Sequence, residues 1–191
     1  LRESSSEYAQ GGIAAALNDD DEVGLHELDT ISAGDGLCDL PAVRTLVEEA
    51  PAAIEELIEW GAAFDREGAN LLFAREGAHS RNRVLHAHGD STGREIVRAL
   101  RARAASFSNI RFQSFEAITD LLMEDGKVAG VLAFDEATRS TVMIRARAVL
   151  LATGGVGRVF ENTTNPNVAT GDGVAIAYRN GLCTAAARHA C

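Results

Sequence analysis

The sequence predicts an α/β fold with an inserted β-meander. Two stretches, residues 41–60 and 92–105, repeat apolar residues at helical spacing, which is typical of amphipathic helices. Between residues 116 and 145, alternating stretches separated by turn residues indicate antiparallel strands. The unbroken apolar run 148–152, followed by Thr-Gly-Gly, is typical of a parallel strand buried on both faces, with a ligand crevice beyond its carboxyl end.

The composition is globular and excludes several function classes. The 191 residues suit one domain or slightly more, and 46% hydrophobic with 24% charged residues allows a sizeable core. A net charge of -10 argues against nucleic-acid binding, and no apolar run approaches the roughly 18 residues of a membrane span. The three cysteines are too far apart for a metal site or a disulfide framework, which favours a cytoplasmic location: Cys38, Cys183 and Cys191.

Near its start the chain places serines and a glycine pair ahead of a short apolar segment, "SSSEYAQGGIAAAL". Residues 13–17 are predicted to form a short helix, and the acidic run 18–22 a solvated loop. Serine hydroxyls and glycine N–H groups before a helix favour an anion, because free N–H groups and the helix dipole point toward it. This stretch is therefore a candidate anion-binding loop.

Two helices account for much of the first half of the chain. Residues 41–60 carry glutamates opposite the apolar face, and Pro51 predicts that this helix is kinked or split. The helix at Thr92–Ala105 is predicted to begin with Thr92 as its N-cap and Glu95 completing a capping box. Between them lies an irregular stretch rich in Gly, Arg and His.

Strands and one helix are predicted for the second half. Asn109–Phe115 alternates like a strand, and Asp125–Gly126 is a turn between two further strands. A last helix over residues 173–179 opens after "TGDG", which places Asp172 at a helix start. On these residues alone, the glycine turns favour a dinucleotide or phosphate ligand, and the alternative is that they only serve tight turns.

Five segments together resemble the flavoprotein family of succinate dehydrogenases, fumarate reductases and L-aspartate oxidases: "SSSEYAQGGIAAAL", "DTISAGDGLCD", "FDRE", "REGAHSRNRVLHAHGDSTGREI" and "ATGG…TTNP…ATGDGVAIAYRNG". The resemblance implies that residues 1–182 form a partial FAD-binding, Rossmann-like domain of an FAD-dependent oxidoreductase. It further implies that the first strands and most of the capping domain are lacking, and that residues 183–191 are a divergent tail.

The resemblance also implies which residues contact FAD. The Ser/Gly loop matches the family's loop around the flavin and pyrophosphate, a strand pair matches the passage beside the adenine, and "ATGG" and "GDG" match turns beside the cofactor. The implied contacts are Ser5, Ser6, Glu7, Tyr8, Ala9, Gln10, Gly11, Gly12, Ala117, Ile118, Ala152, Thr153, Gly154 and Asp172.

Two positions resemble the L-aspartate oxidase branch. Ser5 stands where the dehydrogenases carry the histidine that bonds to the flavin, so FAD is expected to be non-covalent. Glu76 stands where the oxidase has an acid, and a carboxylate suits a substrate with an α-ammonium group. Glu76 is thus the expected catalytic-site residue that orients the substrate, with His79 and Arg83 as further substrate contacts. His86, His88 and Asp90 are interpreted as loop scaffolding.

The implied reaction is the oxidation of L-aspartate to iminoaspartate, the first step of quinolinate and NAD biosynthesis, with oxygen or fumarate as the electron acceptor. Quinolinate synthase is the implied downstream partner. The family's acid/base arginine matches no position here, so the chain alone is expected to be inactive. The alternatives are a fumarate reductase or succinate dehydrogenase flavoprotein-like segment, a non-catalytic FAD-binding relic, and a purely structural α/β module. Ala78 replaces a family glycine, and a positive φ there would cost about 1 kcal/mol.

Overall fold

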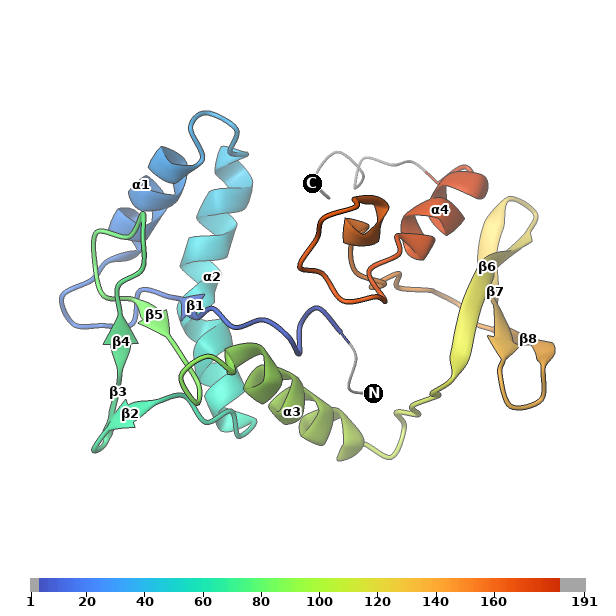
Figure 1. Ribbon diagram of the computed structural model, residues 1–191, viewed down its shortest axis with the longest axis horizontal. Coiled ribbons are helices and arrows are strands. Elements are labelled where there is room, and N and C mark those ends of the chain that lie inside the picture. Colours follow the sequence, from blue (N-terminus) through green and yellow to red (C-terminus); the bar gives the residue numbers. More distant parts are fainter. Residues whose placement is uncertain (1–3, 183–191) are drawn as a thin grey trace. The chain divides into compact units, whose positions relative to one another are not determined.

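The computed structural model describes residues 4–182 and divides the chain into two compact units (Figure 1). The N-terminal unit is Ser6–Ile110, and the C-terminal unit is Arg111–Cys191 together with Leu1–Ser5. The tail predicted at 183–191 lies outside the described residues. The combination of helices and strands agrees with the predicted α/β class. Within residues 4–182, no helix combines the length and the apolar character that crossing a membrane requires.

The N-terminal unit packs helices against a small antiparallel sheet with strand order β1-β5-β4 (Figure 1). The central strand β5 brings Leu85 into a core with Ile54 of the long helix α2 and Ala99 of α3. The elements are β1 (Ile13–Ala14), α1 (Val23–Ala33), α2 (Leu40–Glu59), β2 (Arg66–Glu67), β3 (Asn70–Leu71), β4 (Phe73–Ala74), β5 (Val84–Leu85) and α3 (Thr92–Ala105).

Helix α2 confirms the predicted helix at 41–60, although it is not split. Asp39 caps its N-terminus by accepting a hydrogen bond from the Ala42 N–H at 3.0 Å. Pro51 lies inside one continuous helix. Val47 and Ile54, on either side of the proline, are buried, and this apolar packing holds the helix together across the hydrogen bond that proline cannot donate.

In the first thirty-odd residues, one prediction is wrong and one helix was missed. The predicted helix at 13–17 is instead strand β1, because Ile13 pairs with Leu85 and Ala14 with Val84. Pairing across the sheet outweighs the helix propensity of a short alanine-rich segment. Helix α1, in contrast, was not predicted, since its sequence mixes polar and apolar residues without a clear apolar stripe.

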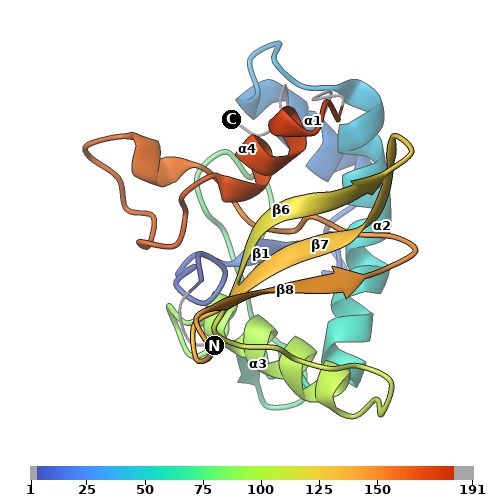
Figure 2. The same cartoon turned by 90° about the vertical axis from the view of Figure 1, so that its right-hand side faces the viewer.

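The C-terminal unit contains the predicted β-meander, in which strands β6, β7 and β8 lie side by side (Figure 2). Asp125 and Gly126 connect β6 to β7 with φ of 50° and 75°, as a tight hairpin turn requires. The elements are β6 (Glu116–Glu124), β7 (Lys127–Asp135), β8 (Ser140–Arg145), the 3₁₀ turn η1 (Gly157–Val159) and α4 (Asp172–Arg179), the last being the predicted terminal helix.

Two predicted strands, one at the boundary between the units and one in the C-terminal unit, are not formed. Asn109–Phe115 and the apolar run Ala148–Ala152 are both irregular. A buried parallel strand needs partners on both sides for its N–H and C=O groups, and within residues 4–182 no strand pairs with the apolar run. Leu150 is accordingly 89% exposed.

Candidate functional site

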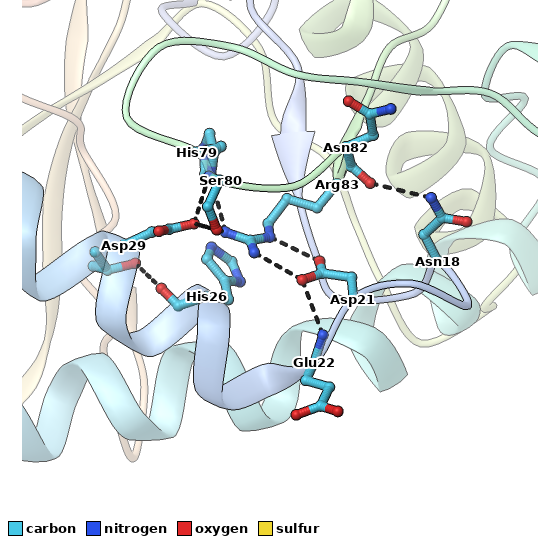
Figure 3. Close-up of polar contacts among 10 residues, drawn as sticks. Asn18, Asp21, Glu22, His26, Asp29, His79, Ser80, Asn82 and Arg83 are labelled. Carbon is cyan, nitrogen blue, oxygen red and sulfur yellow. Dashed lines mark hydrogen bonds and ion pairs between the residues drawn. The ribbon is translucent and has the colours of Figure 1, made fainter.

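In the N-terminal unit, Arg83 ties the predicted substrate loop to helix α1 (Figure 3). Its side chain is fully buried. Nε and Nη2 donate to the two carboxylate oxygens of Asp21 at 2.8 and 2.7 Å, and Nη1 donates to Asp29 at 2.5 Å. This double ion pair uses the planar guanidinium fork in the geometry that suits carboxylates best.

Asp29 also receives two hydrogen bonds from the loop itself. The Ser80 N–H donates at 2.7 Å and the Ser80 hydroxyl at 2.8 Å (Figure 3). Burial alone would raise the pKa of Asp29, but the hydrogen bonds from Ser80 and Arg83 lower it to about 2. Asp29 is therefore ionised at neutral pH and holds both ends of the segment 80–83.

Two histidine rings lie beside this ion pair. The rings of His26 and His79 are 5.7 Å apart, and His79 Nδ1 is 3.3 Å from Arg83 Nη1. Burial and the Arg83 charge lower the pKa of His26, and its buried Nδ1 has no hydrogen-bond partner among the described residues. Arg83 is thus engaged by Asp21 and Asp29, while substrate contacts by His79 and Arg83 stay predictions.

Glu76, the predicted substrate-orienting residue, forms a pair with His86. Its Oε1 lies 3.0 Å from His86 Nε2, and the Glu76 side chain is 49% exposed. Gly12 lies against the same imidazole: a Cβ there would come within 2.9 Å of His86 Nε2 and overlap the Val84 side chain. The fold therefore brings the predicted flavin loop and the predicted substrate carboxylate to the same imidazole, that of His86.

The loop Ser6–Gly12 rests on the first turn of helix α3. The Gly93 N–H donates to the Ala9 carbonyl at 3.0 Å. A Cβ on Gly93 would overlap the Ser6 carbonyl oxygen, so only glycine allows this close approach. The side chains of the loop at Ser6 and Gln10 remain exposed.

The predicted capping box at α3 is wrong. The N-cap is Ser91, without a side-chain cap, and the Thr92 hydroxyl instead accepts from the buried Ala87 N–H at 3.1 Å. Glu95 accepts from the Ala63 N–H at 2.7 Å. Hydrogen bonds from Arg98 lower the pKa of Glu95 to about 2. Burial alone would raise this pKa, and the hydrogen bond from the Ala63 N–H lowers it further. These side chains brace neighbouring loops rather than the helix end.

The C-terminal unit brings together the predicted "ATGG" and "GDG" residues. A Cβ on Gly173 would overlap the Thr153 hydroxyl, so the turn packs on the first residues of helix α4. Gly154 has a φ of 77°, and Asp172 accepts from the Thr170 hydroxyl at 2.7 Å. Both Gly154 and Asp172 are exposed.

Ala117 and Ile118 lie in strand β6 of the same unit, opposite Phe134 and Ala133. Ala117 lines a surface hollow of about 410 Å³, whose other walls are Phe115, Glu116, Phe134, Glu136 and Arg139. Three of these six lining residues are apolar and three are charged. Ile118 is half-buried, and its predicted adenine contact stays a prediction.

These residues fit FAD in each unit separately. Exposed hydroxyls and glycine N–H groups of the kind that bind a diphosphate lie in the Ser6–Gly12 loop and at the Thr153–Gly154 turn. No cluster of three or more metal-ligating side chains occurs within residues 4–182.

Sequence reasoning missed the partners of the substrate loop. Asp21 belongs to the acidic run that was predicted to be a solvated loop, but its side chain is fully buried on Arg83. Asp29 stands three residues after the buried His26 in α1, so both lie on one helical face. The helical spacing of His26 and Asp29 can be recognised in the sequence. The pairing of Asp29 with Arg83, 54 residues away, depends on the fold.

The family described as "FAD binding domain" matches residues 2–189. The chain is 49% identical to the L-aspartate oxidase of Nostoc sp. over 180 residues, covering 93% of this chain and 31% of that protein. It is 48% identical to the L-aspartate oxidase of Streptomyces coelicolor over 187 residues, covering 95% and 32%. The chain thus spans about a third of the length of these curated relatives.

Two solved structures share this fold. Mycobacterium smegmatis Sdh1 in complex with UQ1 matches with a TM-score of 0.87 and 34% identity, covering 93% of this chain and 32% of that one. The FrdA chain of an Escherichia coli quinol fumarate reductase variant matches with a TM-score of 0.87 and 33% identity, covering 92% and 30%. With the family match spanning nearly every residue, the chain belongs to the FAD binding domain family, whose cofactor is FAD.

Proposed function

We propose that the protein containing this chain is an FAD-dependent oxidoreductase that oxidises L-aspartate to iminoaspartate. The observation that carries this proposal is the pairing of the Glu76 carboxylate with His86, whose ring also lies against Gly12 of the loop predicted to hold the flavin. The identities of 49% and 48% with two L-aspartate oxidases support it.

Glu76 would bind the α-ammonium group of the substrate. A half-exposed carboxylate attracts an ammonium ion by charge and accepts a charge-assisted hydrogen bond from it. This contact would fix the direction in which the single C–H bond of the α-carbon points toward the flavin, and orientation of that kind accounts for much of the rate in such reactions. The oxidation removes a hydride from the α-carbon and a proton from the nitrogen.

The Ser6–Gly12 loop would contact the cofactor. FAD, when bound, supplies the hydride-accepting chemistry. Ser5 and Ser6 carry hydroxyls that donate to phosphate oxygens but form no bond to a flavin ring, so we propose that FAD is non-covalent. Oxygen or fumarate as the final acceptor, a downstream quinolinate synthase and a cytoplasmic setting complete the proposal.

Oxidation of succinate, or reduction of fumarate, is the second candidate. It is favoured by the TM-scores of 0.87 to Sdh1 and to the fumarate reductase chain. These dicarboxylates have no ammonium group, so they give the Glu76 carboxylate no partner and would be repelled by its charge. Glu76 therefore favours the amino acid.

Anaerobic reduction of the FAD-loaded protein tests the choice. L-Aspartate is expected to bleach the flavin absorbance, while succinate at equal concentration leaves it oxidised. Bleaching by succinate alone would contradict the proposal. After precipitation in acid, the flavin is expected in the supernatant, and yellow colour retained in the protein pellet would contradict non-covalent binding.

A further inference from the structure

We propose that His86 is a positioning residue for Glu76, holding one carboxylate oxygen so that the other faces the substrate ammonium group. This inference rests on the proposed oxidation of L-aspartate and deepens it. His86 does not touch the reacting atoms in this account. It acts through the carboxylate that binds them.

The direction of the hydrogen bond follows from its chemistry. His86 Nε2 and Glu76 Oε1 are 3.0 Å apart. An ionised carboxylate can only accept, so Nε2 carries the proton and donates. Oε1 is then occupied, and Oε2 keeps its acceptor capacity for an ammonium group.

The backbone fixes the position of His86. The side chains that flank it along the chain, Leu85 and Ala87, are fully buried, and the β1–β5 ladder pairs Leu85 with Ile13. Continuing this antiparallel register by one residue places His86 opposite Gly12. His86 directly follows the core strand β5, whereas Glu76 lies on an exposed loop.

Gly12 makes room for the ring. A side chain at this position would come within 2.9 Å of His86 Nε2 and within 2.7 Å of the Leu85 carbonyl oxygen. The same residue belongs to the loop predicted to contact the flavin. The pairing of β5 with β1 therefore fixes His86 against this loop, and the hydrogen bond from His86 fixes Glu76. A carboxylate on an exposed loop gains a defined position in this way.

The test compares His86 variants of the FAD-loaded protein. His86→Phe keeps a ring but loses the donor, and the KM for L-aspartate is expected to rise about tenfold or more because the carboxylate is misplaced. The inhibition constant of succinate, which lacks the ammonium group, is expected to stay within about twofold. His86→Gln, whose amide N–H reaches a similar position, is expected to restore most of the lost affinity.

Controls separate positioning from general damage. His88→Asn removes an imidazole that is 66% exposed, at a positive φ of 51° that asparagine tolerates, and wild-type kinetics are expected. His86→Ala provides a second, smaller variant with the same expected direction as His86→Phe.

Two outcomes are decisive. An unchanged KM for L-aspartate in both His86→Phe and His86→Ala, or equal weakening of aspartate and succinate, would overturn the inference while leaving the proposed function intact. A wild-type protein that L-aspartate does not reduce would overturn the proposed function, and this inference with it.

Discussion

Ala78 adopts a left-handed backbone conformation, with a φ of 70°, in the loop that carries Glu76. This confirms that the position requires a positive φ, which alanine adopts only with strain. Ala78→Gly is expected to stabilise the protein by about 0.5–1 kcal/mol, measured by urea unfolding. Ala102→Gly, in the exposed interior of α3, is the control and is expected to destabilise by about 1 kcal/mol. A destabilising Ala78→Gly would show that the strain is absent.

Arg83 is the residue whose loss should affect stability most. Arg83→Met leaves the Asp21 and Asp29 carboxylates without their cation, and a broken buried pair costs about 3–5 kcal/mol. Arg44→Met removes an exposed partner of Glu27 and is expected to cost less than about 1 kcal/mol. Equal losses of unfolding free energy in the two variants would contradict the buried ion pair.

The carboxylates of Asp29 and Glu95 predict a loss of stability in acid. Their folded-state pKa values, both about 2, lie below the ordinary values of 3.8 and 4.5. The folded protein thus binds protons less readily than the unfolded chain, so this stabilisation is complete above about pH 5 and is lost as the pH falls toward 2. Urea midpoints between pH 7 and 3 are expected to fall, and to fall less steeply in Asp29→Asn. An identical slope in that variant would exclude Asp29 as a contributor.

At the scale of elements, the contact between the Ser6–Gly12 loop and helix α3 depends on Gly93. Gly93→Ala places a methyl group on the Ser6 carbonyl, and we expect a loss of about 2 kcal/mol together with weaker FAD binding, measured by flavin fluorescence. Gly24→Ala is the matched control, since nothing lies within 4 Å of its Cβ position in helix α1, and a gain of up to about 1 kcal/mol is expected there. Wild-type FAD affinity in Gly93→Ala would contradict a role of this contact in shaping the loop.

Elements were predictable where local pattern and tertiary structure agree. Helix α3 has the predicted bounds, Thr92–Ala105, and the β6–β7 hairpin turns at Asp125 as expected. The failures at β1 and at Ala148–Ala152 both concern backbone hydrogen bonds with distant strands. Such pairing is invisible in a window of neighbouring residues.

At the scale of the whole molecule, the family and its cofactor were predictable from long motifs, and the match over residues 2–189 confirms them. The site was predictable in part. Glu76 and Gly12 were both candidates, but their proximity through His86 depends on the β1–β5 register. The partners of Arg83 could not be predicted, because ionic pairing over 54 and 62 residues depends on the folded chain.

The central claim is that Glu76 binds the ammonium group of L-aspartate. The most direct measurement is the dissociation constant of L-aspartate for the FAD-loaded protein, from perturbation of the flavin absorbance, in wild type and Glu76→Gln. Losing a charge-assisted hydrogen bond costs about 1.5–3 kcal/mol of binding free energy, so the affinity for L-aspartate is expected to fall about 10- to 100-fold. Succinate binding should be unchanged or tighter in Glu76→Gln. Equal L-aspartate affinity in the two proteins would contradict the account.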